Sequence, residues 1–75
     1  MFPTILVVDD EATILQSLSG ILSDEGFEVL TASNGYEALK VIEEASPDLV
    51  LLDIWMPGMD GIETLQEIKR TSPSL

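Results

Sequence analysis

The sequence contains no cysteine and no histidine, and it has only three basic residues against fourteen acidic ones. Without thiols or imidazoles the chain can form no disulfide and lacks the usual ligands of zinc and copper, so a hard cation bound through oxygen is the metal that remains. The net charge of −11 repels nucleic-acid phosphates and anionic membrane surfaces. We therefore expect this segment to bind neither nucleic acid nor membrane directly.

Long hydrophobic runs are also missing. No apolar stretch approaches the roughly 20 residues that span a bilayer, and the first residues lack the basic region of a signal peptide. This pattern is typical of a cytoplasmic protein. With 75 residues, of which 45% are hydrophobic, the chain is predicted to form one small domain over residues 1–75 with a thin core.

Short apolar runs alternate with stretches of helical spacing. The runs at 4–8, 27–32 and 49–52 predict strands. Apolar residues at helical spacing predict three helices: one between Glu11 and a stop at Gly26, one over about 35–45, and one ended by Pro73. This alternation predicts an α/β fold with a parallel sheet and helices on both of its faces.

Several local signals set the expected helix boundaries and faces. Asn34 with Glu37, and Asp60 with Glu63, have the spacing of N-terminal caps. Ser46-Pro47 is expected to break the second helix. Ile62, Leu65 and Ile68 are expected to share one face of the third.

Three aspartates come directly after predicted strands. Asp9 and Asp10 follow the first strand and Asp53 follows the third. Because ligands of parallel sheets bind beyond the carboxyl ends of the strands, we expect these carboxylates to meet at one edge. The alternative is structural: Asp9 and Asp10 form a turn and an N-cap, and Asp53 only ends a strand.

Carboxylates gathered this closely repel one another, and a Mg²⁺ ion would neutralise them. Backbone carbonyls from the loop after Asp53 could complete an octahedral shell of oxygen ligands. If the ion also held a phosphoryl group, a remaining carboxylate could attack phosphorus and form an aspartyl phosphate.

Three segments together resemble the response-regulator receiver domain of two-component signalling. They are Val7-Val8-Asp9-Asp10-Glu11, Leu49-Val50-Leu51-Leu52-Asp53 and Met56-Pro57-Gly58-Met59-Asp60-Gly61. The resemblance implies a truncated flavodoxin-like fold with strand order 2-1-3, in which strands four and five and helices four and five are absent. The phrase DIWMPGMDGIETL is similar to receivers of sigma-54-dependent, nitrogen-regulation transcriptional regulators.

The resemblance also implies a role for each site residue. Asp53 would be the phosphoacceptor, receiving a phosphoryl group from a sensor histidine kinase. Asp10 and Asp53 would contact Mg²⁺ directly, Asp9 would act through water, and Trp55 would supply its backbone carbonyl. The output domain would lie outside these residues, and the chain would signal rather than turn over a substrate.

Other residues near the site are assigned to structure. Pro57-Gly58 is expected to form a type II turn and Asp60 to cap the third helix. The family's phosphate-gripping hydroxyl and lysine belong to strands four and five. The three basic residues here are expected on solvated helix faces instead: Lys40, Lys69 and Arg70.

The strand at 49–52 should be buried, yet this chain pairs only one of its edges. We expect the open apolar edge to cause self-association or marginal stability. A dimerising interaction module that is not phosphorylated is therefore an alternative function. A magnesium-dependent aspartyl phosphatase is a weaker one, because such enzymes generally have an acid two residues after the nucleophile, where this chain has Trp55.

Overall fold

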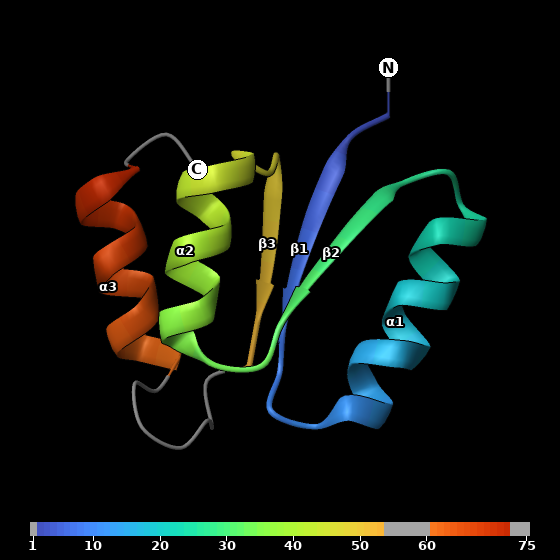
Figure 1. Cartoon of the computed structure of the whole chain (residues 1–75), viewed down its shortest axis with the longest axis horizontal. Helices are drawn as coiled ribbons and strands as arrows, with labels where there is room; N and C mark the ends of the chain where they lie inside the picture. The colour runs from blue at the N-terminus through green and yellow to red at the C-terminus, as the bar shows by residue number, and fades with distance from the viewer. Residues whose placement is uncertain (1, 54–60, 73–75) are drawn as a thin grey trace.

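The computed structural model of the chain describes residues 2–53 and 61–72. They form β1 (Thr4–Val8), α1 (Ala12–Asp24), β2 (Glu28–Ala32), α2 (Gly35–Ala45), β3 (Leu49–Leu52) and α3 (Gly61–Thr71) (Figure 1). The predicted order of strands and helices is confirmed, although β2 begins one residue later than predicted. Among these residues no helix is long and apolar enough to cross a membrane.

The three strands form one parallel sheet in the order β2-β1-β3. Leu6 of the central strand lies between Leu30 of β2 and Val50 of β3. Helix α1 packs against β1 and β2, while α2 packs against the same two strands and against α3 (Figure 1). The predicted α/β fold, with strand order 2-1-3 and helices on both faces, is confirmed.

The main core lies between the sheet and the pair formed by α2 and α3. Its buried members are Leu6, Val8, Ala32, Ala38, Ile42 and Ile68. Because side chains alternate along a strand, Ile5 and Val7 of β1 are buried on the opposite face, toward α1. A central strand buried on both faces explains why residues 4–8 are a continuous apolar run.

The predicted apolar face of α3 is only partly correct. Ile68 is buried, but Ile62 and Leu65 are 57% and 48% exposed, and the completely buried residue is Thr64. Gly61, Thr64 and Ile68 form the buried stripe instead. Helix α3, which packs against α2, therefore turns this narrow stripe inward and leaves the bulkier side chains of Ile62 and Leu65 outside.

The helix ends follow their local sequence signals. Asn34 Oδ1 accepts a hydrogen bond of 2.8 Å from the Glu37 backbone N–H, as predicted for a cap. The Glu37 carboxylate in turn accepts hydrogen bonds from the backbone N–H and the hydroxyl of Ser33. Gly26, with φ of +94°, and Ser46, with φ of +48°, follow α1 and α2 in conformations that stop a helix.

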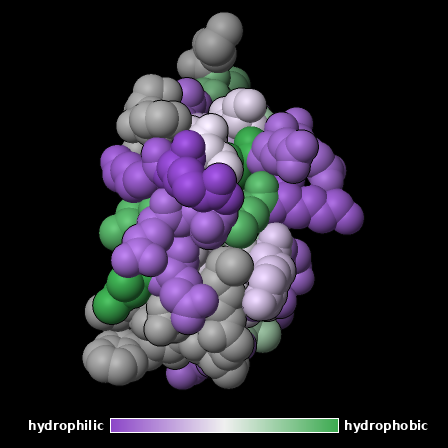
Figure 2. All heavy atoms as spheres, turned by 90° about the vertical axis from the view of Figure 1, so that its left-hand side faces the viewer, coloured by the Kyte–Doolittle hydropathy of each residue, from purple (hydrophilic) through white to green (hydrophobic). Residues whose placement is uncertain are grey.

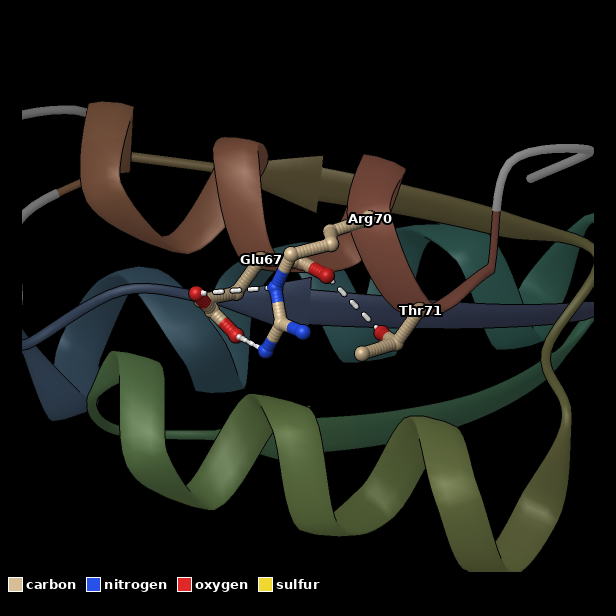
Figure 3. Close-up of polar contacts among 3 residues, drawn as sticks. All are labelled: Glu67, Arg70 and Thr71. Atoms are coloured by element: carbon tan, nitrogen blue, oxygen red, sulfur yellow. Dashed lines mark hydrogen bonds and ion pairs between the residues drawn. The ribbon is translucent and has the colours of Figure 1, made fainter.

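The exposed side of α3 carries an ion pair in its last turns. Arg70 donates to both carboxylate oxygens of Glu67, with a shortest distance of 2.6 Å, and the Thr71 hydroxyl donates to the Glu67 carbonyl (Figure 3). Hydrogen bonding, with Arg70 as donor and the Glu67 carboxylate as acceptor, lowers the pKa of Glu67 and raises the pKa of Arg70. The contribution of the Glu67 carboxylate to folding stability is present above its ordinary pKa of 4.5. This contribution is lost as the pH falls through the lowered pKa.

As predicted, the basic side chains lie on exposed helix faces: Lys40, Lys69 and Arg70.

Strand β3 is less buried than predicted. Leu49 is 49% exposed and Leu51 37% exposed, whereas Val50 and Leu52 pack against the core. The cause is the position of α1, which covers β1 and β2.

The expected roles of Trp55, Pro57-Gly58, Asp60 and Pro73 fall outside the described residues.

Candidate metal centre at the carboxyl edge of the sheet

Backbone hydrogen bonds of the sheet fix the backbone positions of two of the three aspartates. The Asp9 N–H donates to the Ala32 carbonyl at 3.1 Å, and the Asp53 N–H donates to the Val8 carbonyl at 3.0 Å. Hydrogen bonding between strands therefore continues one residue past β1 and past β3. Asp9 and Asp53 are anchored on a rigid sheet, which limits how far their carboxylates can separate.

The Asp9 side chain is oriented by its own loop. Its Oδ1 accepts a hydrogen bond of 2.9 Å from the Glu11 backbone N–H, which makes a short aspartate turn. Sequence analysis missed this role of Glu11, although an aspartate two residues before a backbone N–H is a known signal for such a turn. The bond occupies only part of the acceptor capacity of the Asp9 carboxylate, which can still offer an oxygen to a cation.

The N-cap that the structural alternative predicted at Asp10 is wrong. The residue before the first turn of α1 is Glu11, and no side chain caps the helix there. Asp10 is exposed and is the middle residue of the turn between Asp9 and Glu11. Capping of α1 therefore does not explain the acidic side chain of Asp10. The turn predicted for Asp9 is confirmed.

The three carboxylates meet as the sequence predicts. One oxygen each from Asp9, Asp10 and Asp53 lies within 4.8 Å of the other two. Oxygen ligands of an octahedral Mg²⁺ lie about 2.1 Å from the ion, hence about 3 Å apart when adjacent and about 4.2 Å apart when opposite. Small side-chain rotations would bring these oxygens to such distances. The donor set, all carboxylate oxygen, also matches the preference of a hard cation.

The site borders a hollow between α1 and the sheet. A cavity of about 350 Å³ is lined by Val7, Val8, Asp9, Ile14, Leu18, Leu51, Leu52 and Asp53. Most of this lining is aliphatic, and the two carboxylates stand at its acidic end. Apolar walls lower the local dielectric constant and strengthen the attraction of the cluster for a cation.

Comparison with known proteins assigns the chain to a family. The family described as the response regulator receiver domain matches residues 5–75. The chain belongs to this family. Receiver domains are signalling modules, so this one is not a turnover enzyme.

Named relatives agree with the assignment. The CpxR homolog of Haemophilus influenzae, a transcriptional regulatory protein, is 52% identical over 68 residues, which are 91% of this chain and 30% of that protein. The response regulator TrrA of Thermotoga maritima, solved in complex with Mg(2+)-BeF, is 47% identical with a TM-score of 0.92 over 96% of this chain and 63% of TrrA. NtrX of Brucella abortus, solved in complex with ATP, is 49% identical with a TM-score of 0.94 over 100% of this chain and 17% of NtrX. The chain thus spans less than a third of the Haemophilus regulator and about three-fifths of TrrA.

Proposed function

We propose that residues 1–75 are part of a receiver domain that accepts a phosphoryl group on Asp53 with the help of Mg²⁺. The donor would be the phosphohistidine of a sensor kinase, in the cytoplasm. The observation that carries this proposal is the meeting of Asp9, Asp10 and Asp53 within 4.8 Å at the end of a sheet that belongs to the receiver family. The three positions come from two strand ends 44 residues apart, counted from Asp9 to Asp53.

Each residue has a distinct part in the proposed reaction. Asp10 and Asp53 would hold the ion directly, Asp9 through water, and Trp55 through its backbone carbonyl. Bound Mg²⁺ would offset the like charges and attract the phosphoryl oxygens. An Asp53 carboxylate oxygen then bonds to phosphorus while the phosphorus–nitrogen bond of the phosphohistidine breaks, and the released imidazole takes a proton from water.

The relatives support the chemistry and the pathway. Beryllium fluoride resembles a phosphoryl group in charge and shape, and TrrA was solved with it together with Mg²⁺. The Haemophilus relative is a transcriptional regulatory protein, and the phrase DIWMPGMDGIETL resembles receivers of the nitrogen-regulation class. We therefore propose that phosphorylation of this module controls a transcriptional output domain outside these residues.

Phosphorylation of Asp53 can be tested with acetyl phosphate, a small phosphoryl donor. Incubating the chain with acetyl phosphate and Mg²⁺ should give a hydroxylamine-labile adduct that mass spectrometry locates on Asp53. Residues 1–75 alone should give a low yield, because the hydroxyl and lysine that grip the phosphoryl group in the family belong to strands four and five. Omitting Mg²⁺ should abolish the adduct.

The matched control is Asp53→Asn, which removes the nucleophile and keeps the shape of the side chain. Asp48→Asn, at the other end of β3, removes the same charge outside the site. An adduct that persists in Asp53→Asn, or that disappears in Asp48→Asn while circular dichroism shows a folded chain, would contradict the proposed role of Asp53.

A further inference from the structure

The N-terminal end of α2 contains the only asparagine of the chain, Asn34, which is followed by Gly35. Because glycine has no side chain, its backbone nitrogen can approach the Asn34 side-chain amide closely. Asn34 is half-buried and its backbone is extended, with φ of −160° and ψ of 172°. The Gly35 N–H is among the first N–H groups of α2, which have no acceptor within the helix. The nitrogen of Gly35 is therefore not held by the hydrogen bonds of the helix.

The cap of α2 keeps these two groups apart in the folded chain. Asn34 Oδ1 is fixed by the 2.8 Å hydrogen bond from the Glu37 N–H, and Gly35 is buried. The Glu37 carboxylate accepts hydrogen bonds of 3.3 Å from the Ser33 N–H and 3.1 Å from the Ser33 hydroxyl. Attack by the Gly35 nitrogen requires the Asn34 side chain to turn away from Glu37 and requires water to reach Gly35. The intact cap therefore slows the reaction, and opening of the first turn of α2 permits it.

The rest of α2 is held by the core. Ala38 and Ile42 are buried in the core that α2 shares with Ile68 of α3. Figure 2 looks from the α3 side and shows hydrophobic atoms exposed on both sides of a band of hydrophilic side chains. Opening the whole of α2 would add buried apolar surface to what water already meets there, whereas the ends of helices open locally at much lower cost. Local opening at Asn34 therefore precedes any wider loss of α2.

We propose that Asn34 is a deamidation site whose rate is set by opening of the first turn of α2. The Gly35 nitrogen gives up its proton to base and bonds to Asn34 Cγ. The bond from Cγ to Nδ2 breaks, and the leaving nitrogen takes a proton from water and departs as ammonia. Water then opens the resulting five-membered succinimide at either of its two carbonyls. The products are aspartate at position 34, or isoaspartate, in which the main chain runs through the side-chain carbon atoms.

The two products affect α2 in opposite ways. Aspartate keeps an oxygen that accepts from the Glu37 N–H and adds a negative charge at the positive end of the helix, so the cap is retained. Isoaspartate lengthens the main chain by one carbon atom and displaces the carboxylate, so the cap is lost. Asn34 lies two residues beyond Ala32, whose carbonyl accepts from the Asp9 N–H. The new negative charge therefore arises at the same edge of the sheet as the aspartate cluster.

The experiment is incubation of the chain at mildly alkaline pH, followed over time by intact mass and by peptide mapping. Each event replaces the amide of Asn34 by a carboxyl group, and fragment spectra distinguish aspartate from isoaspartate. In guanidinium chloride, where the cap is lost, deamidation should be about tenfold or more faster than in buffer. Asn34→Ser keeps a capping side chain without an amide. It should show no such mass change, which excludes the two glutamines as the source.

Two alanine variants of α2 test control by the cap in buffer. Glu37→Ala removes the carboxylate that holds Ser33 and should speed deamidation about threefold or more. Glu43→Ala is the matched control, because Glu43 is an exposed glutamate farther along the same helix, and it should leave the rate unchanged. Circular dichroism checks that both variants are folded, and the comparison of buffer with guanidinium chloride needs neither of them.

Three results would overturn the proposal. One is an Asn34 that stays intact in guanidinium chloride, and another is deamidation that is as fast in buffer as in the denaturant. The third is an equal rate for Glu37→Ala and Glu43→Ala when both are folded, because the cap would then not control the reaction.

Discussion

Replacing Asp10 with asparagine is expected to stabilise the metal-free chain and to remove most of its affinity for Mg²⁺. Asp10 is exposed and shares a cluster with Asp9 and Asp53 in which the oxygens lie within 4.8 Å. Removing one of three like charges at that separation should raise the free energy of unfolding by about 0.5–1 kcal/mol in a solvated site. Loss of a direct ligand should weaken Mg²⁺ binding by about 10- to 100-fold or more.

Urea denaturation with and without Mg²⁺ measures both effects. With Mg²⁺ at about ten times its dissociation constant, the original chain should gain about 1.4 kcal/mol of stability, and Asp10→Asn should gain little. Glu28→Gln removes the same charge from β2, away from the site, and should keep the full gain. If Asp10→Asn destabilised the metal-free chain, the carboxylates would not be repelling one another as the geometry requires.

Replacing Leu6 with alanine is expected to remove a large share of the stability of the chain. Leu6 is completely buried in the central strand, where it contacts the core shared with α2 and α3. Truncating such a leucine costs about 2–5 kcal/mol. A chain of this size has only about 4–11 kcal/mol of stability in total, at roughly 0.05–0.15 kcal/mol per residue.

Thermal and urea unfolding followed by circular dichroism measure the loss. The control is Ile21→Ala, because Ile21 is a large aliphatic residue on α1 that is 59% exposed. Its replacement should change stability by less than about 0.5 kcal/mol. Similar losses for Leu6→Ala and Ile21→Ala would show that the core does not lie between the sheet and the two helices α2 and α3.

Periodicity and cap signals predicted the elements of this fold because they act locally. The strands at 4–8 and 49–52, the helix at 35–45, the cap at Asn34 and the stop at Gly26 all depend on neighbours within a few residues. The prediction that the three carboxylates lie together is confirmed, because parallel strands bring their carboxyl ends to the same edge of the sheet. Asp9, Asp10 and Asp53 could be placed together without knowing any side-chain conformation.

The errors concern how elements pack against one another. Apolar spacing placed Ile62 and Leu65 on one face with Ile68, but the residues of α3 that are buried are Gly61, Thr64 and Ile68. Leu49 and Leu51 are exposed for a related reason, since α1 lies over β1 and β2. Neither the axis of a helix nor the strand that it covers is encoded in the spacing of apolar residues.

The central claim is that the carboxyl edge of the sheet binds one cation specifically, and a Mg²⁺ titration followed by backbone amide NMR tests it most directly. The chain has fourteen acidic residues, so nonspecific binding over the surface is the competing explanation. A specific site predicts saturable shifts concentrated at Asp9, Asp10, Glu11 and Asp53, which disappear in Asp10→Asn. Small, unsaturated shifts spread over the acidic residues of α1, α2 and α3, unchanged in Asp10→Asn, would contradict the claim.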